Sequence, residues 1–226
     1  MEKKRKLRLV RKIYFLINWF IRITLLIAIY QSIRNNNYMA LFFSLVVFFI
    51  TFIPYIFNWR FSLKIPTEIQ MIIVLFIYSS LYLGEIQSYY TKFWWWDIFL
   101  HAGSAIIFGF LGFTILYFMY SKNNIKARPW AIAIFSFSFA IAIGATWEIF
   151  EFSVDQLLGY NMQKSGLIDT MGDLIVDALG AILATSIGYI YLKTKKTIVF
   201  NTLIKGLVLE NKSIFGKGFR KILRKV

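Results

Sequence analysis

Eight ionisable side chains lie inside otherwise apolar segments of this chain, at spacings that repeat with the turn of an α-helix. A charged side chain at the centre of a bilayer costs roughly 3 kcal/mol or more, so such residues are candidates for a functional site. A cluster of them persists only where protons, partner charges or a bound cation compensate the burial of charge. The eight residues are Asp97, His101, Glu148, Glu151, Asp155, Asp169, Asp173 and Asp177.

Helical spacing sorts these residues into groups, because residues three or four apart share one face of a helix. Asp97 and His101 form a pair, and the acids within 148–155 and within 169–177 form two ladders, in arcs of about 60° and 80°. Carboxylates and an imidazole from facing helices are the ligands that a hard divalent cation accepts. We therefore predict a site for one or two divalent metal ions, with Mg, Mn, Ca and Zn all open. The predicted ligands are Glu148, Glu151, Asp155, Asp169, Asp173 and Asp177.

Three of the candidates also have simpler explanations. Acids at the start of a helix cap its free N–H groups and interact favourably with its dipole, so Asp97 and Asp169 can be caps alone. A single histidine in a bundle is more often a hydrogen-bonded interior residue than a ligand. The spacing from Asp97 to His101 favours the functional role, and both alternatives stay open.

Other candidates are not explained by capping. Asp173 and Asp177 lie one and two turns beyond any cap of the predicted sixth helix. Glu85 and Asp155 approach the carboxyl ends of their helices, where a negative charge is unfavourable. For these residues we favour a functional role. Glu148 lies deeper in the predicted fifth helix and needs a partner within the bundle.

The elements that must position these residues are transmembrane helices. The chain is 58% hydrophobic and 19% aromatic, with a mean hydropathy of +0.62. Apolar runs of about 20 residues predict membrane spans. We predict an all-α polytopic protein with one domain over 13–192, flanked by basic tails at 1–12 and 193–226. The six predicted spans are 13–33, 38–57, 67–88, 97–120, 130–156 and 170–192.

Basic residues predict the orientation of the spans, because Lys and Arg concentrate on the cytoplasmic side. The tail 1–12 carries seven and the tail from 193 carries ten. Both termini are therefore predicted to be cytoplasmic, in a multi-pass plasma (inner) membrane protein. The acidic residues then meet at the extracytoplasmic face, where Glu85 joins them from the end of the third span.

The net charge of +15 resides in the two tails and does not indicate nucleic acid. Basic segments beside a membrane attract anionic lipid at roughly 1 kcal/mol per residue, and 197–226 mixes apolar with basic residues as an interfacial helix does. A solvated tail that only sets the orientation explains the same charges. The chain contains no Cys, which excludes disulfides and thiolate ligands.

Four segments resemble the YjdF-like family of bacterial inner-membrane proteins, over about residues 66–190. The resemblance implies a multi-span plasma-membrane protein of unknown biochemical function. The segments are Ser80-Leu81-Tyr82-Leu83-Gly84-Glu85, Trp95-Trp96-Asp97 with Leu100-His101, Trp147-Glu148 with Glu151 and Asp155, and Asp169-Thr170 with Asp173, Asp177 and Gly180.

Two functions of different classes fit these residues, and whether the protein is an enzyme stays open. The first is a metal-dependent hydrolase or transferase acting on a lipid head group or another phosphorylated substrate. Its catalytic residues would be His101 as ligand or general base, Asp97 as the residue that orients it, and Glu85 as a nearby acid. The second is a carrier or sensor of cations. A non-catalytic partner of another membrane protein is a third possibility.

Overall fold

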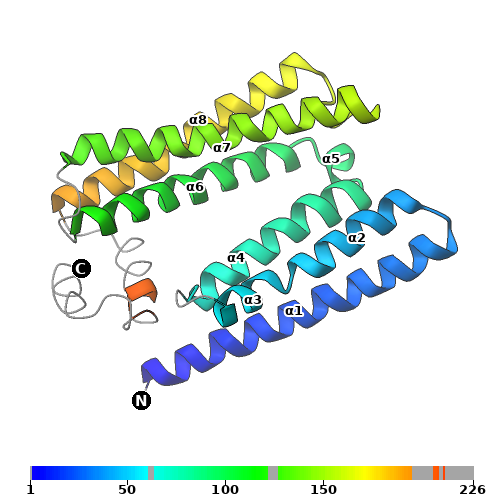
Figure 1. The fold of residues 1–226 in the computed structure, drawn as a ribbon, viewed down its shortest axis with the longest axis horizontal. Coiled ribbons are helices and arrows are strands. Elements are labelled where there is room, and N and C mark those ends of the chain that lie inside the picture. Colours follow the sequence, from blue (N-terminus) through cyan, green and yellow to red (C-terminus); the bar gives the residue numbers. More distant parts are fainter. Residues whose placement is uncertain (1, 61–63, 122–126, 195–205, 209–210, 212–226) are drawn as a thin grey trace. The chain divides into compact units, whose positions relative to one another are not determined.

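The protein is described by a computed structural model that covers residues 2–60, 64–121, 127–194, 206–208 and 211. Within these ranges the chain is helical and contains no strand (Figure 1). The helices are α1 (Glu2–Arg34), α2 (Tyr38–Ile50), α3 (Ile53–Arg60), α4 (Thr67–Ile77), the π-helix η1 (Tyr78–Ile86), α5 (Tyr89–Lys92), α6 (Trp96–Ser121), α7 (Pro129–Leu158) and α8 (Leu167–Thr194).

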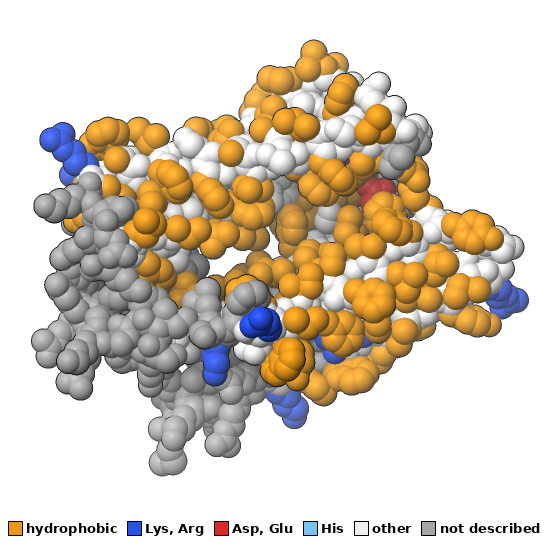
Figure 2. Space-filling view, viewed as in Figure 1, with side chains coloured by type: hydrophobic (Ala, Val, Ile, Leu, Met, Phe, Trp, Pro, Cys, Tyr) orange, Lys and Arg blue, Asp and Glu red, His pale blue; other side chains and the backbone are white. Residues whose placement is uncertain are grey.

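Six helical segments are long and apolar enough to cross a membrane, which confirms the predicted all-α polytopic architecture. Two of the spans are composite, because α2 runs on into α3 and α4 runs on into η1. Hydrophobic side chains cover most of the helical surface visible in Figure 2, as a lipid environment requires. The spans are Lys12–Arg34, Tyr38–Arg60, Thr67–Ile86, Trp96–Tyr120, Pro129–Leu157 and Leu167–Thr194.

The chain divides into two compact units. Unit 1 contains α1 to α5 and unit 2 contains α6 to α8. The single domain over 13–192 and the cytoplasmic position of both termini stay predictions. The basic residues of the amino tail belong to α1, whereas the tail from 193 lies largely outside the described residues.

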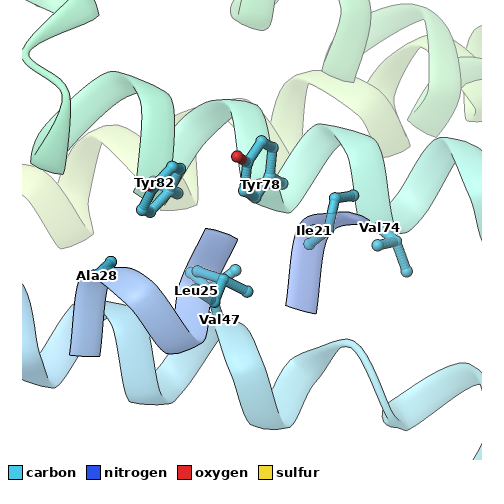
Figure 3. Close-up of a cluster of buried hydrophobic side chains, with 7 residues drawn as sticks. All are labelled: Ile21, Leu25, Ala28, Val47, Val74, Tyr78 and Tyr82. Atoms are coloured by element: carbon cyan, nitrogen blue, oxygen red, sulfur yellow. The ribbon is translucent and has the colours of Figure 1, made fainter. Parts of the chain in front are cut away.

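Unit 1 is held together by a row of apolar side chains on one face of α1 (Figure 3). Ile21, Leu25 and Ala28 recur at intervals of four and three residues, so they share that face. They pack against Val47 of α2 and against the α4–η1 span. The same span supplies the stacked rings of Tyr78 and Tyr82 and the side chain of Val74.

The break between α2 and α3 is stabilised by Arg22 from α1. Its Nε donates to Thr51 Oγ1 at 3.1 Å and its Nη2 donates to the Thr51 carbonyl at 3.2 Å. The guanidinium also lies 3.9 Å from the centre of the Phe52 ring. Pro54 has no N–H to donate to the preceding turn, so a cation at the negative end of α2 compensates the interruption.

Unit 2 is a close-packed bundle of three helices. Small residues allow the helices to approach, as is usual between transmembrane segments. A Cβ atom at Gly180 of α8 would lie 2.9 Å from the Ala102 carbonyl oxygen and 3.0 Å from Ala105 Cβ, both of α6. One at Gly109 of α6 would lie 2.8 Å from Ala184 Cβ. This packing fixes α6 against α8 directly beside the ionisable residues.

Candidate metal centre

His101 is the central residue of the ionisable cluster in unit 2. It lies one turn into α6 and is only 6% exposed. Its Nε2 faces three carboxylates from three helices: Asp97 Oδ1 at 3.8 Å, Glu148 Oε1 at 3.8 Å and Asp173 Oδ2 at 4.0 Å. Its Nδ1 lies 3.4 Å from Asp177 Oδ1. Both nitrogens of one imidazole are therefore directed at carboxylates.

Helix periodicity explains how α6 and α8 surround the ring. Asp97 and His101 are four residues apart on α6, so both project from one face. Asp173 and Asp177 have the same spacing on α8, which places one beside each nitrogen of the imidazole. The sequence pattern thus predicts these two pairs correctly as neighbours.

Gly144 makes room for Asp177 and was missed by sequence reasoning. A Cβ atom at position 144 would collide with Asp177 Oδ2. Gly144 lies on α7 one turn before Glu148, on the same face, so the missing side chain leaves space beside the cluster. Its position four residues before a predicted ligand was the available signal.

Two of the carboxylates are buried without a hydrogen-bond partner in the described part of the chain. Asp177 is 1% exposed and Glu148 is 4% exposed. Neither oxygen of either group accepts a hydrogen bond from the described residues, and His101 Nδ1 likewise has no partner of good geometry. A buried, unpaired carboxylate is costly unless a cation or a proton compensates it.

Lys164 contacts the cluster from the loop between α7 and α8. Its Nζ lies 2.5 Å from Asp97 Oδ2, while the other oxygen of Asp97 faces His101. Both side chains are partly exposed, unlike Glu148 and Asp177. Lys164 therefore supplies one positive charge at the accessible edge of the site.

The geometry is suitable for a metal ion. One ligand atom each from Asp97, His101 and Asp173 lie within 4.8 Å of one another, and this group can hold an ion. Two ligands bound to one cation at 2.0–2.2 Å are themselves about 3–4 Å apart. The separations of 3.8–4.0 Å between His101 Nε2 and the carboxylates match this requirement.

Three other predicted ligands have different partners. Glu151 Oε1 accepts a hydrogen bond from Trp147 Nε1 at 2.9 Å. Asp155 accepts from the backbone N–H groups of Met162 at 2.6 Å and Gln163 at 2.9 Å, so both of its oxygens hold the loop after α7. Asp169 is half-buried in the first turn of α8. Ligand roles for Glu151, Asp155 and Asp169 stay predictions.

Glu85, the predicted catalytic acid, belongs to unit 1. It lies in η1, a nine-residue π-helix, and such wide turns are frequent at functional sites. Tyr90 of α5 packs against η1. Its hydroxyl lies 3.0 Å from Ser80 Oγ, and its ring occupies the space beside Gly84. A catalytic role for Glu85 stays a prediction.

These helices and their buried ionisable residues define a multi-pass membrane protein with a group of side chains able to hold a metal ion. Residues 7–194 match the family described as predicted membrane protein (DUF2238), and the chain belongs to this family. The match confirms the predicted resemblance to a membrane family of unknown function.

A relative of this chain is known from Thermotoga maritima as an uncharacterized protein. The two are 33% identical over 143 residues, which cover 61% of this chain and 70% of the relative. No solved structure matches the chain.

Proposed function

We propose that the protein binds a divalent cation through His101 Nε2 and the carboxylates of Asp97, Glu148 and Asp173. The observation that supports this most strongly is the convergence of three carboxylates from three helices on one imidazole nitrogen, at 3.8–4.0 Å. We assign the orientation of the ring to Asp177, because its Oδ1 lies 3.4 Å from the opposite nitrogen and is the carboxylate oxygen nearest to it among the described residues. A carboxylate in that position fixes the tautomer of a metal-binding histidine.

The balance of charge supports a divalent ion. Four carboxylates surround His101, and Lys164 is paired with one of them. Even a protonated imidazole leaves this group with excess negative charge inside a bundle of apolar helices. A divalent cation compensates that excess at the point where the carboxylates converge.

We further propose that the centre serves hydrolysis or group transfer on a lipid head group. His101 and Asp173 lie five and six residues from the starts of α6 and α8, about 7–9 Å along the helix axes. The segment Trp94–Trp96 lies at the start of α6, directly before Asp97, and aromatic residues of this kind mark the membrane interface. A bound cation would polarise a phosphate oxygen or activate water.

A cation carrier is less well supported, because the helices are tightly packed beyond the cluster. Ala181 and Ala184 of α8 are fully buried, and Ala184 lies against Gly109 of α6. A carrier requires polar groups along its path. In the two turns of α8 that follow Asp177, the residues at four-residue intervals on this face are Ala181 and Thr185, and the Thr185 hydroxyl donates to the Ala181 carbonyl at 2.8 Å.

Metal analysis of the purified protein tests the proposal. The protein is stripped with a chelator, dialysed against Mg, Mn, Ca or Zn, and its metal content is measured beside that of a His101→Gln, Asp173→Asn variant. We expect about one ion per chain in the parent and almost none in the variant. Glu68→Gln, in the first turn of α4, is the matched control and keeps the ion. Equal metal in all three proteins would overturn the proposal.

A further inference from the structure

A groove of about 510 Å³ lies between the second half of α7 and the first half of α8. Its volume is within the range of roughly 300–1,000 Å³ that small-molecule sites occupy. One part of its wall is apolar and the other is polar, so the lining is amphipathic. The apolar wall includes Ala145, Ile149, Phe152 and Leu174, and the polar part includes Glu148, Gln163 and Thr170.

The groove opens on the surface of two membrane-spanning helices. Its walls belong to the spans Pro129–Leu157 and Leu167–Thr194. Ile149 is 65% exposed and Phe152 is 53% exposed. Large apolar side chains exposed on a membrane span face lipid rather than water. A bilayer lipid is therefore the molecule available to enter.

Glu148 joins the groove to the candidate metal centre. It lines the groove, and its Oε1 lies 3.8 Å from His101 Nε2. Neither of its oxygens has a hydrogen-bond donor within the described residues. Nearby, Gln163 Nε2 donates to Thr170 Oγ1 at 2.6 Å, so the polar end is ordered by side chains of the loop and of α8. Glu148, Gln163 and Thr170 therefore form the polar part of the lining, next to the candidate metal centre.

We infer that this groove binds one acyl chain of a bilayer phospholipid and directs its head group to Glu148. The apolar wall is complementary to the chain. Oε1 of Glu148 faces His101 and the proposed cation, whereas Oε2 is complementary to a head group with hydrogen-bond donors, such as ethanolamine. The lipid enters laterally from the membrane. Lipid binding itself depends only on the groove, whereas the role of this lipid as the substrate rests on the proposed function.

Photo-cross-linking in nanodiscs tests the inference. The full-length protein is reconstituted with phosphatidylethanolamine that carries a diazirine in one acyl chain, and labelled peptides are mapped after irradiation. We expect labels to concentrate within 145–174. Filling the groove with Ala145→Trp or Leu174→Trp reduces this labelling about tenfold, equivalent to losing the burial of about two methylene groups.

The control adds the same indole to a position on α8 that does not line the groove. Ile182 is 50% exposed, and Ile182→Trp keeps the parental labelling. Labels spread evenly over all spans, or undiminished labelling in both wall variants, would overturn the inference. Metal content measured on the same samples separates the two proposals. If the parent protein is labelled in the groove but binds no ion, the inference about the groove is supported and the proposed metal centre is refuted.

Discussion

The Asp177 carboxylate of α8 occupies the space that any side chain at Gly144 of α7 would fill. The absence of a side chain at position 144 therefore makes room for the carboxylate of Asp177 where α7 contacts α8. Gly144 lies on the same face as Glu148, so this contact is part of the wall around His101. The shape of the cluster depends on a residue that has no ionisable group.

Gly144→Ala is expected to displace Asp177 and distort the centre. Overpacking a well-packed site destabilises a protein by about 1–3 kcal/mol, and the loss of a carboxylate that supports a ligand weakens metal binding about 10–100-fold. Thermal unfolding and metal titration measure the two effects. Gly103→Ala in α6 is the control, because a Cβ atom there meets no atom within 4 Å. Equal melting temperatures and equal metal affinities of the two variants would show that Asp177 does not need the space at Gly144.

Asp173→Asn and Asp177→Asn are expected to differ in their effect on metal affinity. Asp173 faces the nitrogen that we assign to the metal, whereas Asp177 faces the other nitrogen of His101. The first variant should lose nearly all binding. The second should retain it at about 10–100-fold lower affinity, as expected for a group that orients a ligand. Competition with a fluorescent chelator resolves both affinities, and the reverse order would exchange the two assignments.

Lys164→Met is expected to strengthen cation binding. The lysine ammonium lies on Asp97, one of the proposed ligands, and its charge repels an incoming cation. Removing an ion pair at a partly exposed site changes the free energy by about 1 kcal/mol, or roughly fivefold in affinity. Lys92→Met is the matched control, since Lys92 Nζ donates to the Gln87 carbonyl in unit 1. Weaker binding in Lys164→Met would show that the lysine supports the site.

Arg22→Met is expected to destabilise unit 1 without changing the metal content. The variant removes two hydrogen bonds from a charged donor to Thr51, and such bonds contribute about 1.5–3 kcal/mol each. Thermal unfolding in detergent measures the loss. Arg34→Met, at the exposed end of α1, is the control. An unchanged melting temperature in Arg22→Met would indicate that the break after α2 is stable without it.

The fold was predictable because its dominant signals are local. Runs of apolar residues define the six spans whatever their tertiary contacts, and only their ends shift by a few residues. Two features of the fold could not be predicted from the local sequence pattern. The hydrogen bonds that stabilise the interruption at Thr51 come from Arg22 on another helix, and the π-helical hydrogen bonding of η1 is not visible in the apolar pattern of the sequence.

The centre of the site was predictable where one helix sets the spacing. Asp97 with His101 and Asp173 with Asp177 follow from single periodicities. Asp155 continues the ladder of α7 equally well in sequence, yet its oxygens accept hydrogen bonds from a loop whose path no periodicity describes. Gly144 was missed because its role is to leave room for the side chain of Asp177, and this is visible only when α7 and α8 are packed together.

The hydrogen bonds to Asp155 tie the loop that carries Lys164 to the end of α7. The amide protons of Met162 and Gln163 exchange with solvent only when this loop detaches, because each is held by a carboxylate oxygen. Lys164 follows Gln163 directly in the chain, so we expect the same detachment to separate it from Asp97. Hydrogen exchange at two backbone positions in the loop thus reports how often the charged edge of the cluster opens.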